Sequence, residues 1–172
     1  MATTCKLIAK NVLGSAAASV TLSSIPATHT DLLLLVSCRG DTNVGSAPQY
    51  GTDFYLRLNG DTSNHSSRVL VGKGNSAYST NPSSIRGVLT LPRATSSTFG
   101  NTEFYIPNYA GSTKKSVSVT SVQESNHAND VYIECAAGLW DSTSAVTSLE
   151  VWPYSGNFVA DSSFYLFGIT KS

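Results

Sequence analysis

The chain has 172 residues, and its eleven basic and eleven acidic side chains cancel to a formal net charge of zero. A chain of this length forms one hydrophobic core, so we expect a single domain over residues 1–172. Only 13% of the residues are charged, and no excess of either sign is present to attract phosphate groups. Nucleic acid and membrane surfaces are therefore not expected as partners.

Apolar and polar residues alternate along the whole chain, which is the pattern of half-buried strands. Segments 5–13 and 19–25 come first and are predicted to form a hairpin around Gly14-Ser15. Residues 31–38 are apolar on both faces, which predicts a central strand. The stretch 72–81 is rich in Gly, Ser and Asn and is predicted to be an exposed loop. Further strands are predicted at residues 53–58, 67–71, 84–91, 101–106, 115–122, 131–136, 146–152 and 163–169.

About ten short strands, with no convincing amphipathic helix between them, predict an all-β fold. The economical arrangement is a jelly-roll-like, two-sheet antiparallel β-sandwich, because a single open sheet would leave one apolar face in water. Ser and Thr supply about a quarter of the residues, so the strand faces and edges carry few charges to prevent pairing with other chains. We therefore expect a homo-oligomer, and a homotrimer in particular.

Three cysteines, Cys5, Cys38 and Cys135, are too few and too widely spaced to form a complete disulfide framework. They are expected to be reduced thiols in the core, which fits folding in a cytoplasm. The first residues lack the basic and apolar regions of a secretory signal. The longest apolar run, residues 32–36, is far shorter than a membrane span.

No pattern in the sequence indicates catalysis or metal binding. The chain has no Gly-x-Ser-x-Gly motif, and His29, His65 and His127 each lie in a polar, turn-like context. Residues 41–45 and 59–64 offer oxygen ligands that could help to bind calcium, but turns capped by Asp or Asn explain both segments more simply. We therefore predict no catalytic residue, no metal site and no cofactor, and the chain is not expected to be an enzyme.

Three short segments resemble binding motifs but are interpreted as turns. Residues 72–75 lack the spacing of a phosphate-binding loop and are predicted to be a loop tip. Lys114-Lys115 is predicted to be a solvated turn rather than a basic patch. Arg39-Gly40-Asp41 matches the tripeptide that integrins recognise, but Arg and Asp commonly flank a turn glycine.

Aromatic residues in or beside polar turns are the remaining candidates for a recognition surface, because rigid Tyr and Trp rings bind sugars and protein partners. Packing in the core is the alternative for each of them. The candidates are Tyr50, Tyr78, Tyr109, Trp140 and Tyr154.

Four segments resemble a family of small virion proteins of tailed bacteriophages, especially those of marine and cyanobacterial hosts. They are residues 24–32, 56–61, 101–111 and 156–169, and the likeness runs over most of the chain. The resemblance implies a β-sandwich displayed on the virion and no catalytic residues. It also implies that the partners are further copies of the chain and other virion proteins, such as the major capsid or tail proteins.

Two placements on the particle remain open. A capsid decoration protein is favoured, because the chain has neither an N-terminal adaptor nor a repetitive shaft of the kind that tail fibres use. The alternative is a tail fibre or tail appendage subunit that binds a receptor. A carbohydrate-binding module for host surface glycan is a hypothesis from another class, and the Tyr and Trp candidates would serve it.

Overall fold

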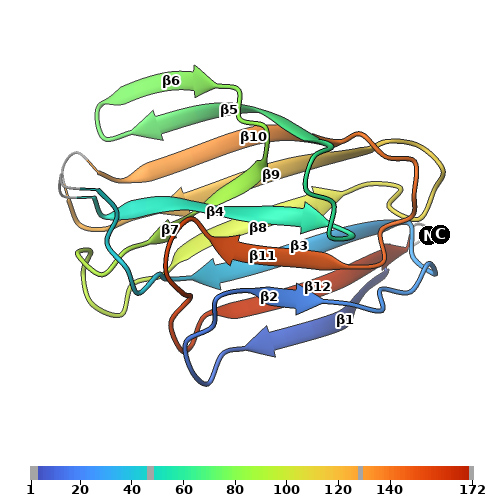
Figure 1. The fold of residues 1–172 in the computed structure, drawn as a ribbon, viewed down its shortest axis with the longest axis horizontal. Coiled ribbons are helices and arrows are strands. Elements are labelled where there is room, and N and C mark those ends of the chain that lie inside the picture. Colours follow the sequence, from blue (N-terminus) through green and yellow to red (C-terminus); the bar gives the residue numbers. More distant parts are fainter. Residues whose placement is uncertain (1–3, 46–48, 128–129, 171–172) are drawn as a thin grey trace.

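The computed structural model describes residues 4–45, 49–127 and 130–170, and within them the chain forms twelve strands. The strands pair in two antiparallel sheets (Figure 1). They are β1 (Thr4–Val12), β2 (Val20–Leu22), β3 (Asp31–Cys38), β4 (Gly51–Leu58), β5 (His65–Lys73), β6 (Ser76–Thr80), β7 (Ile85–Thr90), β8 (Gly100–Ile106), β9 (Lys115–Gln123), β10 (Tyr132–Trp140), β11 (Leu149–Pro153) and β12 (Ser163–Thr170). The prediction of an all-β, two-sheet antiparallel sandwich is confirmed.

The strand order is that of a jelly roll with two insertions. The large sheet has eight strands in the order β1-β12-β3-β8-β9-β10-β5-β6, and the small sheet has four in the order β2-β11-β4-β7. Without β5, β6, β9 and β10, two four-stranded sheets remain, and β1, β2, β3 and β4 alternate between them. We call the four inserted strands the wing; β6, β5 and β10 extend beyond the small sheet in Figure 1.

The predicted hairpin of the first two segments is wrong. Strand β1 pairs with β12 in the large sheet, whereas β2 pairs with β11 in the small sheet. The chain between them crosses the end of the sandwich, and Leu13, Val20 and Leu22 are buried in the core. Consecutive strands therefore face each other across the core instead of pairing edge to edge, as the jelly roll requires. The prediction that residues 31–38 form a central strand is confirmed, because β3 lies between β12 and β8.

Aromatic and aliphatic side chains from the two sheets interlock in one continuous core. Phe54 of the small sheet meets Phe104 of the large sheet edge to face, with ring centroids 5.8 Å apart. Phe158 packs against both Phe54 and Phe164, at 6.1 and 5.2 Å. Each of these four rings is fully buried, so together they hold the sheets in register.

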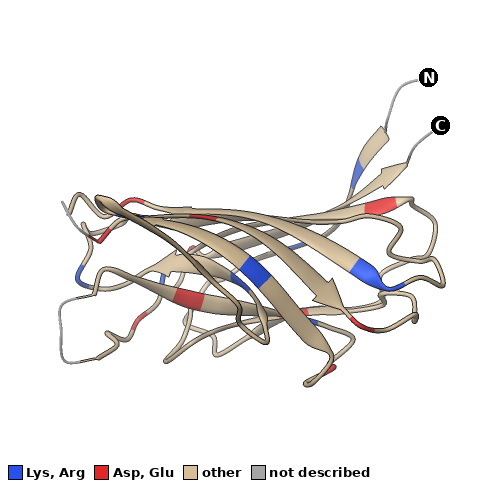
Figure 2. Ribbon diagram, turned by 90° about the horizontal axis from the view of Figure 1, so that it is seen from above, with Lys and Arg blue, Asp and Glu red and all other residues tan. Residues whose placement is uncertain are grey.

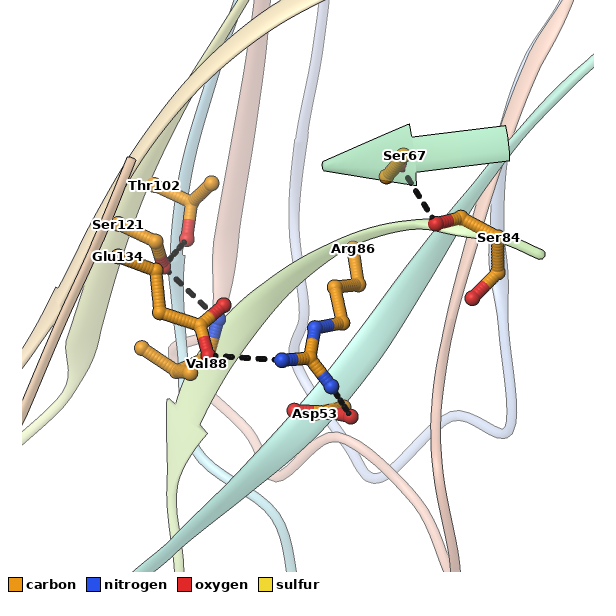
Figure 3. Close-up of polar contacts among 8 residues, drawn as sticks. All are labelled: Asp53, Ser67, Ser84, Arg86, Val88, Thr102, Ser121 and Glu134. Atoms are coloured by element: carbon orange, nitrogen blue, oxygen red, sulfur yellow. Dashed lines mark hydrogen bonds and ion pairs between the residues drawn. The ribbon is translucent and has the colours of Figure 1, made fainter. Parts of the chain in front are cut away.

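Strand β7 is the edge of the small sheet and packs closely against the large sheet. A Cβ atom on Gly87 would lie 2.6 Å from Thr102 Oγ1, so only glycine allows this approach. On the unpaired edge of β7, the backbone N–H of Val88 finds its hydrogen-bond acceptor in the opposite sheet, where it donates to Ser121 Oγ at 2.8 Å (Figure 3). Within the large sheet, Ser121 Oγ also lies 2.6 Å from Thr102 Oγ1, so the hydroxyl group that β7 binds has a second buried partner.

The stretch 72–81, predicted to be an exposed loop, contains the end of β5 and the whole of β6. The two strands form a hairpin around a tight turn at Gly74-Asn75, where Gly74 has a φ of 55°. Ser, Ala and Thr residues hide the strand pattern, because β6 is an edge strand with mostly exposed side chains.

Two further expectations need correction. Only Cys38 is a core thiol; Cys5 and Cys135 are free but exposed, because their side chains lie on the outer side of the large sheet. Lys115, expected in a solvated turn, is buried and donates to the backbone carbonyl oxygens of Gly111 and Thr113. Burial lowers its pKa.

Arg39 is the one residue of the Arg39-Gly40-Asp41 tripeptide that organises a neighbouring loop. Its side chain is almost fully buried and donates to carbonyl oxygens of the segment 92–98, among them those of Thr95 and Thr98, both at 2.9 Å. Asp41 accepts from the backbone and side-chain nitrogens of Asn157. The charged groups that an integrin would contact are thus engaged within the chain.

Replacing Arg39 tests how much this loop depends on the guanidinium. Arg39→Lys keeps the charge but cannot reach all of the carbonyl oxygens, so we expect a loss of about 2–4 kcal/mol in the free energy of unfolding. Urea denaturation measures this, with Arg68→Lys at an exposed position as the matched control. Equal stabilities of the two variants would contradict the role assigned to Arg39.

Candidate functional site

A polar cleft lies where the wing overhangs the edge of the small sheet. Its volume is about 350 Å³. One wall is formed by the inward side of β6 and β10, and the other by β4 and β7 with the residues that follow β11. The cleft exists because the large sheet is wider than the small sheet that faces it. Its lining combines aromatic and charged side chains with smaller residues, namely Asp53, Tyr78, Arg86, Tyr132, Glu134 and Tyr154, together with Val44, Gly45, Gln49, Gly51, Thr52 and Val88.

Three charged groups form a chain across the cleft (Figure 3). The guanidinium of Arg86 binds Asp53 Oδ2 at 2.6 Å and Glu134 Oε1 at 3.1 Å. The Glu134 side chain is only 3% exposed, and the Arg86 side chain is 14% exposed. Among the described residues, Glu134 Oε2 and Arg86 Nε have no hydrogen-bond partner. Buried polar atoms without a partner are rare, so this pair offers unused hydrogen-bonding capacity.

Burial controls the ionisation of the two carboxyl groups. It raises the pKa of Glu134 to about 7, an effect that Arg86 opposes and Asp53 reinforces. Burial also raises the pKa of Asp53, against the attraction of Arg86. Near neutral pH, Glu134 is therefore divided between a neutral acid that can donate a hydrogen bond and a carboxylate that can accept one.

A second ion pair fixes the aromatic wall of the cleft. Lys73 Nζ lies 2.8 Å from Asp130 Oδ1 and 4.8 Å from the centroid of the Tyr132 ring. Burial lowers the pKa of Lys73, but its contacts with Asp130 and Tyr132 outweigh this and raise it overall. The Tyr132 hydroxyl donates to Asp130 at 3.0 Å, and Asp130 also accepts from the backbone N–H of Tyr50. Tyr132 is thus held by Lys73 over its ring and by Asp130 at its hydroxyl group.

Two of the predicted recognition residues lie together at the cleft. Tyr78 projects from β6 with 49% of its surface exposed, and Tyr154 follows β11 with 57% exposed. Tyr50 is half-buried and stacks on His127, with ring centroids 4.1 Å apart. A recognition role for these three residues stays a prediction.

The predicted surface positions of Tyr109 and Trp140 are corrected by their burial. Tyr109 is fully buried, and its hydroxyl donates to the carbonyl oxygen of Pro26. Trp140 is 2% exposed, and its indole N–H donates to Asp61 at 2.9 Å. Both rings are large enough to fill the core, and each polar atom finds a partner there, which makes burial favourable.

Asp53, Arg86 and Glu134 were not singled out from the sequence. They come from β4, β7 and β10, which lie far apart in the chain. The only available signal is that Glu134 stands between Ile133 and Cys135 in an otherwise apolar strand. A charged residue inside such a strand indicates either a solvent-facing position or a buried ion pair, and sequence alone does not separate the two.

The outer side of the large sheet is a second unusual surface. Seven of the nine exposed large hydrophobic side chains in the described residues lie on it, as the strand pairing shows. They are Leu7, Val12, Leu35, Leu70, Val122, Ile133 and Leu139. Among the strand residues that the structure describes, the exposed charged residues on this side are Lys10, Arg68 and Glu103. Figure 2 shows long stretches of strand without any charge. We call this surface the outer face.

The raised pKa of Glu134 predicts how stability depends on pH. Between the usual value of 4.5 and about 7, the folded chain holds this proton more tightly than the unfolded chain, so stability falls as pH rises through that window. In Glu134→Gln this part of the loss disappears, and the difference in unfolding free energy between the two chains changes by about 3 kcal/mol across the window.

Urea denaturation at a series of pH values measures the effect. Glu124→Gln, at an exposed carboxyl group, is the control and should keep the pH dependence of the native chain. A Glu134→Gln variant with the same pH dependence as the native chain would mean that the carboxyl group titrates normally.

Comparison with known proteins and sites adds little to this geometry. In the described part of the chain, no group of three or more His, Cys, Asp or Glu residues could hold a metal ion. No helix among the described residues has the length and hydropathy that a membrane span requires. No protein-family model matches the chain, and a search of the curated proteins finds no match.

Proposed function

We propose that the protein is a bacteriophage virion structural protein displayed on the particle surface, in the form of a capsid decoration protein that acts as a homo-oligomer. The observation that carries the assembly role is the outer face of the large sheet. The class of particle is supported by the resemblance of four segments to virion proteins of tailed phages. Association with other virion proteins, such as the major capsid protein, is part of the proposal.

The outer face has the composition of a surface that another protein covers. From Leu35 on β3 to Leu70 on β5 the sheet spans five neighbouring strands, a width of about 19 Å at the usual strand spacing. Val122, Ile133 and Leu139 lie on the strands between them. Exposed apolar patches of this extent on soluble proteins mark interaction surfaces, and burying them stabilises a complex by about 25 cal/mol per Å².

Charge on the outer face favours a second copy of the chain as the occupant. Arg68 on β5 and Glu103 on β8 lie on either side of β9, whose outward side chains are mostly hydroxyl-bearing, and β10, whose outward side chains are apolar. Neither has an ion-pair partner among the described residues. A two-fold contact between two outer faces brings Arg68 of each copy to Glu103 of the other, so both charges are paired across the interface. A homotrimer stays a prediction.

Charge reversal tests this contact. Arg68→Glu or Glu103→Arg alone should weaken self-association by about tenfold, because each places like charges at the interface, and the double variant should restore it. Sedimentation equilibrium measures the association. Lys6→Glu, exposed on the opposite side of β1, is the control and should associate like the native chain.

The exposed thiols provide an independent readout. In an oligomer that covers the outer face, Cys135 should resist alkylation, whereas in a monomer it should react; buried Cys38 stays unreactive in both. A native chain that is a stable monomer at micromolar concentration, with a reactive Cys135, would refute the homo-oligomer.

Placement on the particle is tested by electron microscopy of phage particles that lack this protein. We expect heads with altered surface density or reduced resistance to disruption. Intact heads combined with defective tails or poor adsorption would refute the decoration role. That result would support the alternative, a tail fibre or tail appendage subunit.

A further inference from the structure

We infer that the cleft between the wing and the small sheet is a binding site for a neutral saccharide, one or two sugar rings in length. The site is distinct from the outer face, because its residues lie on the inward side of β6 and β10. Covering the outer face with another copy therefore leaves the cleft open. The inference does not depend on the proposed place in the virion.

The size and openness of the cleft suit a small ligand. A volume of about 350 Å³ is at the lower end of the range for small-molecule sites. The walls come from strands of both sheets, and the ion pairs of Arg86 with Asp53 and Glu134 tie these strands together. The site is thus formed before any ligand arrives, which reduces the entropy lost on binding.

Tyrosine rings supply the apolar contacts that a sugar needs. Tyr78 and Tyr154 present about half of their surface to solvent at the cleft, and Tyr132 also lines it, with its hydroxyl group bound to Asp130 and its ring under Lys73. The C–H faces of a pyranose ring are apolar and pack on the flat faces of aromatic rings. A second ring beside Tyr154, that of Tyr55 at 6.4 Å between centroids, limits how far Tyr154 can turn away.

The polar groups of the cleft match sugar hydroxyls. Glu134 and Arg86 line the cleft, and Glu134 Oε2 and Arg86 Nε are buried in its wall without a partner among the described residues. A hydroxyl group donates and accepts at once, so it can pair with a carboxyl oxygen or a guanidinium N–H when a small side-chain movement exposes that atom. Leaving such atoms unpaired is unfavourable, and a ligand that pairs them is bound more tightly.

Charge balance in the cleft favours a neutral ligand over an acidic one. Among the described residues that line the cleft, Arg86 carries the only guanidinium, which two carboxyl groups share, and the nearby ammonium of Lys73 is paired with Asp130. An acidic sugar would face Asp53 and Glu134 without a free cation to balance it.

Titration of the ¹⁵N-labelled full chain with methyl glycosides of glucose, galactose, mannose, rhamnose and N-acetylglucosamine, and with their disaccharides, tests the inference by NMR. We expect at least one neutral sugar to shift the backbone signals of β6, β10 and the residues near Tyr154 at millimolar concentration. Glucuronic acid, the anionic probe, should bind more weakly.

Matched tyrosine variants locate the site. Tyr78→Ala and Tyr154→Ala should each weaken binding by about tenfold, while Tyr165→Ala, on the outer face, should leave it unchanged. Glu134→Gln keeps both a donor and an acceptor and should bind better than Glu134→Ala. Absence of any shift with every neutral sugar would overturn the inference, as would shifts confined to other strands or equal affinity in the three tyrosine variants.

Discussion

The difference in width between the two sheets is the constraint on which the rest of the structure depends. Four strands cover one side of an eight-stranded sheet, so the jelly roll leaves the inserted wing without a facing layer over part of its inner side. Side chains on an uncovered side of a sheet meet either solvent or a partner, so their chemistry indicates which of the two is present. On the inner side of the wing those residues are tyrosines and paired charges, and on the outer side they are mostly aliphatic and hydroxyl-bearing.

The ion pairs of Arg86 are poorly explained by stability alone. Moving charged groups out of water is costly, and a buried ion pair is often no more stabilising than well-packed apolar residues. Here the cost is larger still, because Glu134 Oε2 and Arg86 Nε lack partners among the described residues. What the arrangement does accomplish is to fix β7 and β4 against β10 at a defined separation. The result is a cleft with fixed walls, and the side chains on those walls determine which ligands it can bind.

Periodicity predicted the strands wherever one side of a strand is buried. Strand β9 alternates buried and exposed residues along its whole length, and it was predicted almost to the residue. Strand β6 was missed because neither of its sides is buried, so the burial that produces alternation is absent. Lys115 was misplaced because a short polar run at the start of a strand looks the same whether its ammonium meets water or carbonyl oxygens.

The site was predictable only in part, for a related reason. Tyr78 and Tyr154 lie on an edge strand and in a polar turn, so the sequence predicts that their rings are exposed. It does not predict that they line the same cleft, because this depends on how the inserted strands of the wing pack beside the small sheet. Strand β10 shows what the alternation makes possible: Ile133 and Cys135 face outward, while Tyr132 and Glu134 face the cleft. One strand can therefore serve an assembly surface and a binding site at once. Because the two sets of side chains point in opposite directions, substitutions on one side can change assembly without altering the geometry of the other.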